Sequence, residues 1–185
     1  ALNYPNLIAL FEALKVETQQ SDMSFSVRDG RPGSEWGSDG ASGYFAWKRN
    51  AFDLNHWALL ADMLRFNSQA QKDVQDPALQ TMSLGDYSAK LGLSQRFLER
   101  YLAPMGAAIW STPEKGMLDY PAASFVRFFN NHRLVHFERP NWRTVTGGSR
   151  RYVEKFAQAL GDRVHLQAPV TQVRRDADGV DAVSY

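Results

Sequence analysis

Two consecutive glycines followed by a serine are the part of the sequence that most directly indicates a binding site. Residues 142–149 (Trp-Arg-Thr-Val-Thr-Gly-Gly-Ser) read as a short strand, a glycine turn and a helix that Ser149 can cap. Glycines let the backbone approach another group closely, and the first turn of a helix offers N–H groups without partners. Gly147 and Gly148 are therefore candidate cofactor contacts, with tight packing of strand against helix as the alternative.

A pair of histidines could in principle hold a metal. His132 and His136 are four residues apart, the spacing that places two imidazoles on one face of a helix. The intervening Arg133-Leu134-Val135 instead indicates a helix that ends and continues as a strand, and this would point the rings apart. We therefore predict no metal site. The sequence also has no Gly-x-Ser-x-Gly motif, so no nucleophile of the common esterase type is visible and no catalytic residue is assigned.

The aromatic residues divide into two groups by their surroundings. Phe97, Phe125 and Phe156 sit at helical core spacing. Others lie near turns or the ends of elements, where either ordinary packing or the wall of a substrate pocket is possible. The second group is Trp47, Trp110, Phe128, Phe129 and Trp142, and the last four are our candidate substrate-pocket residues.

Hydrophobic spacing indicates the elements that position these residues. Apolar residues at i, i+3, i+4 and i+7 predict helices near residues 4–14, 53–71, 122–131 and 149–160. In residues 53–71 the predicted buried side is Trp57, Leu60, Ala61, Leu64 and Phe66. Shorter helices begin at a capping box formed by Ser83 and Asp86, at a Ser94 cap and after a Thr112 cap.

Strand-like alternation predicts two hairpins. One lies near residues 22–37 and turns at Asp29-Gly30. Near the C-terminus, a strand around Val164–Leu166 and a run containing Val170 and Val173 precede a turn at Asp178-Gly179. Residues 37–43, rich in glycine and serine, are expected to form an exposed loop.

Together these elements predict an α+β fold with many helices beside a small mixed or antiparallel sheet. We expect two regions, residues 1–141 and residues 142–185. The sequence stops inside the last strand pattern, so we expect a piece of a longer protein.

Composition excludes several classes of function. The 185 residues carry 21 Lys and Arg against 20 Asp and Glu, a formal charge of +1, which gives no field suited to nucleic acid. The absence of cysteine rules out disulfides, thiolate catalysis and cysteine-ligated metals. No apolar run is long enough to span a membrane, and no signal peptide is visible, so we expect a cytoplasmic protein.

Three stretches resemble one superfamily of flavoenzymes. Residues 145–170, with Gly-Gly-Ser, a helix, Leu-Gly-Asp and then Pro-Val, resemble the middle of flavin-containing amine oxidases. Residues 101–113 look like a segment of protoporphyrinogen oxidases and phytoene desaturases, and residues 4–16 look like the helix after the first dinucleotide-binding unit of these enzymes. The whole chain is similar to bacterial proteins described as flavin-containing amine oxidoreductases.

The resemblance implies FAD as cofactor. Val170 matches the valine whose backbone contacts the adenine of FAD, and Gly147 and Gly148 are placed near the cofactor. Members hold the FAD diphosphate with a Gly-x-Gly-x-x-Gly turn, which this sequence lacks. We therefore expect Rossmann-type segments of the same protein to be the partner that anchors FAD, and we expect residues 1–185 alone to bind no flavin.

By this resemblance residues 1–141 form the substrate-binding region, and residues 142–185 belong to the FAD-binding region, of an FAD-dependent oxidoreductase. The expected reaction transfers a hydride from a substrate C–H bond to flavin. The substrate would be an amine or an apolar compound such as a fatty-acyl chain. The alternative is a non-enzymatic helical binding or interaction domain that shares only the fold.

Overall fold

A computed structural model describes residues 3–28, 30, 35–136, 141–177 and 179–184. The chain divides into two compact units. The helical unit is essentially Ser21–Trp142. The terminal unit combines Tyr4–Gln20 with Arg143–Tyr185, so the first helix belongs to the same unit as the C-terminal segment.

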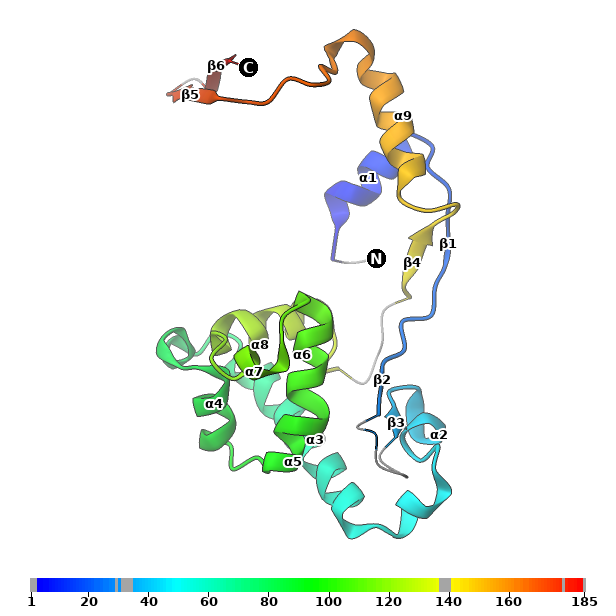
Figure 1. Ribbon diagram of the computed structural model, residues 1–185, viewed down its shortest axis with the longest axis vertical. Helices are drawn as coiled ribbons and strands as arrows, with labels where there is room; N and C mark the ends of the chain where they lie inside the picture. Colours follow the sequence, from blue (N-terminus) through cyan, green and yellow to red (C-terminus); the bar gives the residue numbers. More distant parts are fainter. Residues whose placement is uncertain (1–2, 29, 31–34, 137–140, 178, 185) are drawn as a thin grey trace. The chain divides into compact units, whose positions relative to one another are not determined.

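The helical unit holds short helices around one long helix, with a small hairpin at its start (Figure 1). Two of its helices, Leu54–Asp73 and Ala122–Asn131, fall where hydrophobic spacing predicts them, and its hairpin falls where strand alternation predicts it. Its elements are β2 (Ser26–Val27), β3 (Trp36–Gly37), α2 (Gly40–Tyr44), the 3-10 helix η1 (Lys48–Phe52), α3 (Leu54–Asp73), the 3-10 helix η2 (Pro77–Thr81), α4 (Leu84–Lys90), α5 (Gln95–Phe97), the π-helical turn η3 (Leu98–Leu102), α6 (Ala103–Trp110), α7 (Glu114–Met117) and α8 (Ala122–Asn131).

The first hairpin is shorter than the alternating pattern suggests. Only two residues of each strand pair, with Val27 opposite Trp36 in an antiparallel register. Asp29, predicted to begin the turn, lies outside the described residues, and Gly30 has a φ of 80°. The Trp36 indole is buried, and its Nε1 donates a hydrogen bond to the Arg100 carbonyl 3.0 Å away. The Trp36 side chain therefore helps to anchor the hairpin to the helices.

Residues 37–43 do not form the predicted loop, although residues 39–42 are exposed as expected. The segment contains the end of β3 and most of α2, and Tyr44 at the end of α2 is buried. Gly43 lies against Gly37, since a Cβ on Gly43 would meet the Gly37 carbonyl oxygen at 3.2 Å. Small residues are thus required because two backbone segments pack closely, which composition alone does not distinguish from a solvent-exposed loop.

Helix α3 forms as predicted but buries a different face. Trp57 and Leu64 were expected inside but are 47% and 44% exposed. Of the residues expected on the buried side, Phe66 is the one that is completely buried. The buried residues are His56, Leu59, Asp62, Phe66 and Ala70. The error arises because two of these are polar: the Asp62 carboxylate accepts a hydrogen bond from the Ser94 backbone N–H at 3.1 Å. A polar side chain with a partner is tolerated in a core, and this moves the buried stripe around the helix.

Phe66 is the centre of an aromatic core. Its ring lies 5.5 Å from Phe97, 6.2 Å from Phe125 and 6.3 Å from Phe129, measured between centroids. All four side chains are completely buried. Edge-to-face and tilted aromatic contacts of this kind add stability beyond the area they bury.

Local capping explains several helix boundaries. Ser83 and Asp86 form the predicted capping box at α4, with the Ser83 Oγ accepting from the Asp86 N–H at 3.0 Å. Ser94 caps α5 as predicted. Thr112 does not cap α7, because its hydroxyl donates instead to the Trp110 carbonyl at 3.2 Å.

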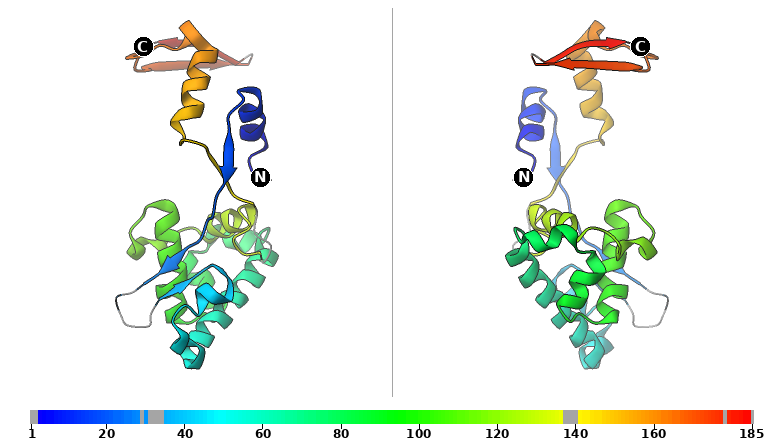
Figure 2. Two further views of the ribbon diagram at one scale, coloured as in Figure 1. Left: turned by 90° about the vertical axis from the view of Figure 1, so that its right-hand side faces the viewer. Right: turned by 90° about the vertical axis from the view of Figure 1, so that its left-hand side faces the viewer.

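The terminal unit joins two segments that are far apart in sequence. Strands β1 and β4 pair antiparallel, with Gln19 opposite Thr144 (Figure 2). Its elements are α1 (Pro5–Ala13), β1 (Thr18–Gln20), β4 (Arg143–Val145), α9 (Arg150–Leu160), the 3-10 helix η4 (Gly161–Arg163), β5 (Gln172–Asp176) and β6 (Gly179–Ser184).

The C-terminal part confirms the predicted hairpin but not the strand before it. β5 and β6 pair antiparallel across the predicted turn, with Asp176 opposite Gly179, while Asp178 itself lies outside the described residues. Residues 164–171 have no regular secondary structure, so the strand predicted around Val164–Leu166 is wrong. Their alternating valines and leucines find no neighbouring strand to pair with in the described part of the chain.

The fold is therefore helix-rich α+β, as predicted, and the strand pairs among the described residues are all antiparallel. The chain leaves the terminal unit after β1 and returns to it at β4. At this point the Ser21 backbone N–H donates to the Trp142 carbonyl at 2.9 Å. The helical unit is thus an insertion whose two ends are adjacent.

Candidate functional site

The Gly147–Gly148 turn links β4 to α9 and depends on both glycines. Their φ values are 79° and 87°, in the left-handed region that favours glycine. The Gly148 N–H donates to the Val145 carbonyl at 3.0 Å, and the Arg151 N–H donates to the Gly148 carbonyl at 3.1 Å. The turn therefore ends the strand and begins the helix within a few residues.

The two glycines differ in what surrounds them. A Cβ on Gly147 would meet the Arg151 Nε at 3.1 Å, whereas a Cβ on Gly148 would meet nothing within 4 Å. At this turn a hollow of about 290 Å³ is lined by Gly147, Arg150, Arg151 and Glu154. A second hollow, of about 350 Å³, lies in the helical unit. The backbone at Gly148 is thus open to a ligand, while Gly147 lies under an arginine side chain.

The charges around this hollow favour an anion. Glu154 is shared by two guanidinium groups, with its Oε1 2.8 Å from the Arg150 Nε and its Oε2 4.0 Å from the Arg151 Nη1. One positive charge is left over at the helix N-terminus, where the helix dipole also favours negative charge. Ser149 does not form the predicted cap, and no acidic residue occupies the first turn of α9. The Ser149 side chain therefore accepts no hydrogen bond from the N–H groups in the first turn of α9.

Sequence reasoning missed Arg150 and Arg151. The available signal was two consecutive arginines directly after Gly-Gly-Ser, at the first positions of a predicted helix. At these positions a cation lies beside the N–H groups of the helix start, an arrangement that opposes the dipole unless an anion is bound.

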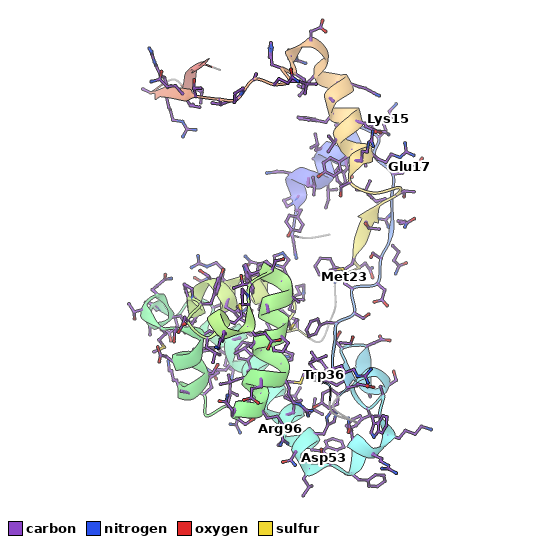
Figure 3. All side chains as sticks on the ribbon, in the orientation of Figure 1. Lys15, Glu17, Met23, Trp36, Asp53 and Arg96 are labelled. Carbon is purple, nitrogen blue, oxygen red and sulfur yellow. The ribbon has the colours of Figure 1, made fainter. Side chains whose placement is uncertain are left out.

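Contacts from the N-terminal segment hold this turn in place. The Thr146 N–H donates to the Glu17 carbonyl at 3.0 Å, and the Lys155 ammonium donates to the Lys15 carbonyl (Figure 3). The Phe11 and Tyr152 rings pack with centroids 5.2 Å apart, so α1 supports α9. The residues that position the site therefore lie more than 120 positions upstream in the sequence. Another such contact joins the Arg143 Nε to the Thr18 hydroxyl across a separation of 125 residues.

Val170 lies beyond the other end of α9. It follows η4 in the irregular segment and is 60% exposed, so the peptide is accessible. A helix of 11 residues is about 16 Å long, and this helix separates Val170 from Gly147 and Gly148 in sequence. The structure does not bring the three candidate cofactor contacts into one cluster.

Three of the four candidate pocket aromatics are neighbours. The Trp110 ring lies 4.9 Å from Phe128, and Phe128 lies 6.4 Å from Phe129. Trp110 and Phe128 are half-buried, whereas Phe129 is completely buried and stacks on Phe125 at 4.1 Å. Phe129 thus takes a core position, while Trp110 and Phe128 present part of an aromatic surface. Trp142 is half-buried where the chain leaves the helical unit.

The larger hollow is a feature that the sequence did not indicate. It lies between the β2–β3 hairpin and α2, and its lining includes Val27, Trp36, Gly43 and Ala46. Arg28 and Glu35 form an ion pair at its edge, with the Arg28 Nε 3.1 Å from the Glu35 Oε1. An apolar floor with one charged pair at the rim suits a small, mainly apolar ligand.

Of the two histidines, His132 packs on an aromatic ring. The His132 ring stacks on Phe128 at 3.9 Å, and its Nδ1 lies 3.0 Å from the Phe128 carbonyl oxygen. Helix α8 ends at Asn131 as predicted, but residues 132–136 form turns rather than a strand. Among the described residues no group of three or more His, Asp and Glu side chains is placed to hold a metal.

Three buried titratable groups lie in the helical unit, and none of them is a lining residue of either hollow. The Tyr44 hydroxyl donates to the His56 carbonyl at 2.8 Å, and the His56 Nε2 lies 2.9 Å from the Tyr44 carbonyl oxygen. Burial raises the pKa of Tyr44 and lowers the pKa of His56. Burial also raises the pKa of Tyr87, whose hydroxyl donates to Asp73 at 2.9 Å. These groups stay neutral near pH 7 and stabilise the fold.

A comparison with protein families decides the class of this protein. The model of the flavin containing amine oxidoreductase family matches residues 3–184. The chain belongs to this family. No curated protein matches the sequence. Within the described residues, every helix is too short or too polar to cross a membrane.

Membership of the flavin containing amine oxidoreductase family implies a flavin in its full-length proteins. The residues at the Gly147–Gly148 turn fit an anionic part of such a group. Gly148 leaves open space where any other residue would place a Cβ, and Arg150 and Arg151 supply cationic donors. Guanidinium groups and helix N-termini are the usual protein ligands of phosphate oxygens.

Proposed function

We propose that this member of the flavin containing amine oxidoreductase family is the substrate-binding portion, with part of the FAD-binding portion, of an FAD-dependent oxidoreductase. Residues 1–141 supply the substrate region and residues 142–185 the cofactor region. The observation that carries the proposal is the family match over residues 3–184, together with an open glycine turn beside two arginines.

The cofactor contacts fall to residues of the terminal unit. The Gly148 backbone accepts close approach, and the Arg150 and Arg151 guanidinium groups neutralise phosphate oxygens. Val170 offers its exposed peptide to the adenine ring. Because the sequence contains no Gly-x-Gly-x-x-Gly turn, Rossmann-type segments of the same protein complete the diphosphate site.

FAD, when bound, accepts a hydride from a substrate C–H bond. The chain's own contribution is to bind and orient the substrate and to exclude water. Trp110 and Phe128 form a partly exposed aromatic surface suited to this task, and the hollow beside Trp36 is a second apolar surface. The substrate is an amine or an apolar compound such as a fatty-acyl chain, and these walls support the apolar compound, because they offer area rather than charge.

A glycine substitution tests the cofactor site. In the intact flavoprotein, Gly148→Ala is expected to weaken FAD retention by about tenfold or more, since the new Cβ occupies the open approach. Retention is measured by flavin absorbance after dialysis and by titration of the apoprotein with FAD.

Gly161→Ala is the matched control for this substitution. Gly161 also has a positive φ, 56°, and open space around its Cβ position, but it lies at the opposite end of α9. It therefore also places a side chain at a positive φ, but away from the Gly147–Gly148 turn. Equal FAD affinity in the two variants would contradict the assignment of Gly148. Stoichiometric FAD on residues 1–185 alone would contradict the expectation that other segments complete the site.

A further inference from the structure

Four apolar side chains surround the point where η1 turns into α3. We call Trp47, Phe52, Leu54 and Trp57 the apolar tip. Phe52 and Leu54 expose 92% and 84% of their surface, which is unusual for large apolar side chains. Asp53 stands between them, and Figure 3 shows side chains projecting outward around it. Phe52 and Leu54 therefore extend into solvent.

The apolar tip is held rigidly in this exposed state. The Trp57 Nε1 donates to the Ala51 carbonyl at 2.9 Å, and the Phe45 and Trp57 rings pack 4.9 Å apart. Asn50 is buried in the middle of η1, and its side-chain amide donates to the Glu35 carbonyl at 3.4 Å. Asp53 caps α3 through the Asn55 N–H at 2.9 Å. Exposure of Phe52 and Leu54 is therefore fixed by the fold rather than by a loose loop.

Positive charge accompanies the apolar tip. Lys48 and Arg49 are exposed on η1, and neither is within ion-pair distance of a carboxylate in the part of the chain that the structure describes. Glu35, the nearest acidic residue on the hairpin, is paired with Arg28. The carboxylate of Asp53 is engaged at the N-terminus of α3, where the helix dipole offsets its charge.

We infer that the apolar tip docks on the surface of an anionic lipid bilayer. Phe52 and Leu54 enter the boundary between headgroups and acyl chains, Trp47 and Trp57 lie at headgroup level, and Lys48 and Arg49 contact lipid phosphates. Tryptophan beside exposed aliphatic and aromatic groups, with adjacent cations, is the composition that interfacial binding uses. The core of a protein interface is depleted of charge, whereas here two cations without an ion-pair partner among the described residues accompany the apolar side chains, which favours a bilayer over a protein partner.

Vesicle binding tests this inference. The full chain is expected to cofloat with vesicles of phosphatidylcholine and phosphatidylserine, and much less with phosphatidylcholine alone. The double substitution Phe52→Ser and Leu54→Ser is expected to reduce binding by about tenfold or more, because two anchors are lost. Both positions are exposed, so circular dichroism is expected to remain unchanged.

Leu166→Ser is the matched control. Leu166 is 83% exposed, yet it lies in the terminal unit between a histidine and a glutamine and far in sequence from the apolar tip. This variant is expected to bind anionic vesicles as the unmodified chain does. Loss of binding in both variants, or in neither, would overturn the inference.

Two further measurements separate the lipid from other occupants. Lys48→Gln with Arg49→Gln is expected to remove most of the preference for phosphatidylserine and most of the salt dependence. Brominated lipids are expected to quench tryptophan fluorescence, and the double substitution Trp47→Phe and Trp57→Phe is expected to abolish this quenching.

Two outcomes would overturn the inference. One is the absence of vesicle binding. The other is a light-scattering result in which the Phe52→Ser, Leu54→Ser variant only changes oligomeric state, since the apolar tip would then contact a second copy of the chain. FAD retention is not a readout here, so the result is independent of the proposed cofactor site.

Discussion

The helical unit and the terminal unit use apolar residues in different ways. In the helical unit, aromatic side chains from α3, α5 and α8 meet in one completely buried cluster around Phe66. In the terminal unit, α1 and α9 contain no buried residue, and Phe156, at core spacing in the sequence, is 44% exposed. Amphipathic spacing thus shows which side of a helix is apolar, but it does not show that the described chain covers that side.

The largest expected effect follows from this difference. Phe66→Ala is expected to destabilise the helical unit by about 3–5 kcal/mol, because it leaves a cavity among rings that are themselves buried. Phe156→Ala is expected to cost less than about 1 kcal/mol, since its ring is already partly in water. Urea unfolding followed by circular dichroism measures both, and similar losses for the two variants would break the comparison.

A second substitution tests how closely the helical unit is packed. A Cβ on Gly106 in α6 would lie 2.6 Å from the Met117 Cε and 3.3 Å from the Phe125 Cε2. Gly106→Val is therefore expected to cost about 1–3 kcal/mol through overpacking. Gly116→Val is its control, because a Cβ there would meet only the Thr112 methyl at 3.9 Å. If Gly106→Val were as stable as the control, the helical unit would have more room than its contacts indicate.

Helix capping gives a smaller and more local contrast. Ser83→Ala removes the hydroxyl that accepts from the Asp86 N–H, one half of the α4 capping box, and is expected to cost about 1 kcal/mol. Ser149→Ala at the start of α9 is expected to change stability by only a few tenths of a kcal/mol, because the Ser149 side chain makes no cap hydrogen bond. Thermal unfolding of both variants checks this order, and a larger loss for Ser149→Ala would show that α9 is capped in solution.

The smallest expected effect is a dependence of stability on pH. Burial lowers the pKa of His56, so the unfolded chain takes up a proton there more readily than the folded chain does. This contribution to stability is complete above about pH 6.5, the ordinary pKa of histidine, and is lost as the pH falls below it. His56→Gln is expected to reduce the slope of unfolding free energy between about pH 7 and pH 5. An unchanged slope would mean that other groups cause it.

Much of the fold follows from local signals in the sequence. Helices α1, α3, α8 and α9 lie within a few residues of their predicted positions, and the capping box at Ser83 is confirmed. The C-terminal hairpin is also confirmed. These features depend on spacing and on caps, which neighbouring residues determine.

The remaining features depend on contacts between distant residues. The buried face of α3 was misplaced because Asp62 finds a partner 32 residues away. Residues 37–43 were taken for a loop because the approach of Gly43 to Gly37 depends on tertiary packing. At the candidate site, the glycines were identified from sequence, whereas Arg150 and Arg151 emerged only from the hollow they line. The roles of Val170, Trp110, Phe128 and Trp142 stay predictions.

The hydrogen bond between Ser21 and Trp142 has a practical consequence. Because the polypeptide goes out and comes back through neighbouring residues, a short peptide bridge could replace everything between them without stretching the β1–β4 ladder. Chimeras joined at these two residues would exchange the whole insertion while keeping both strands of the ladder.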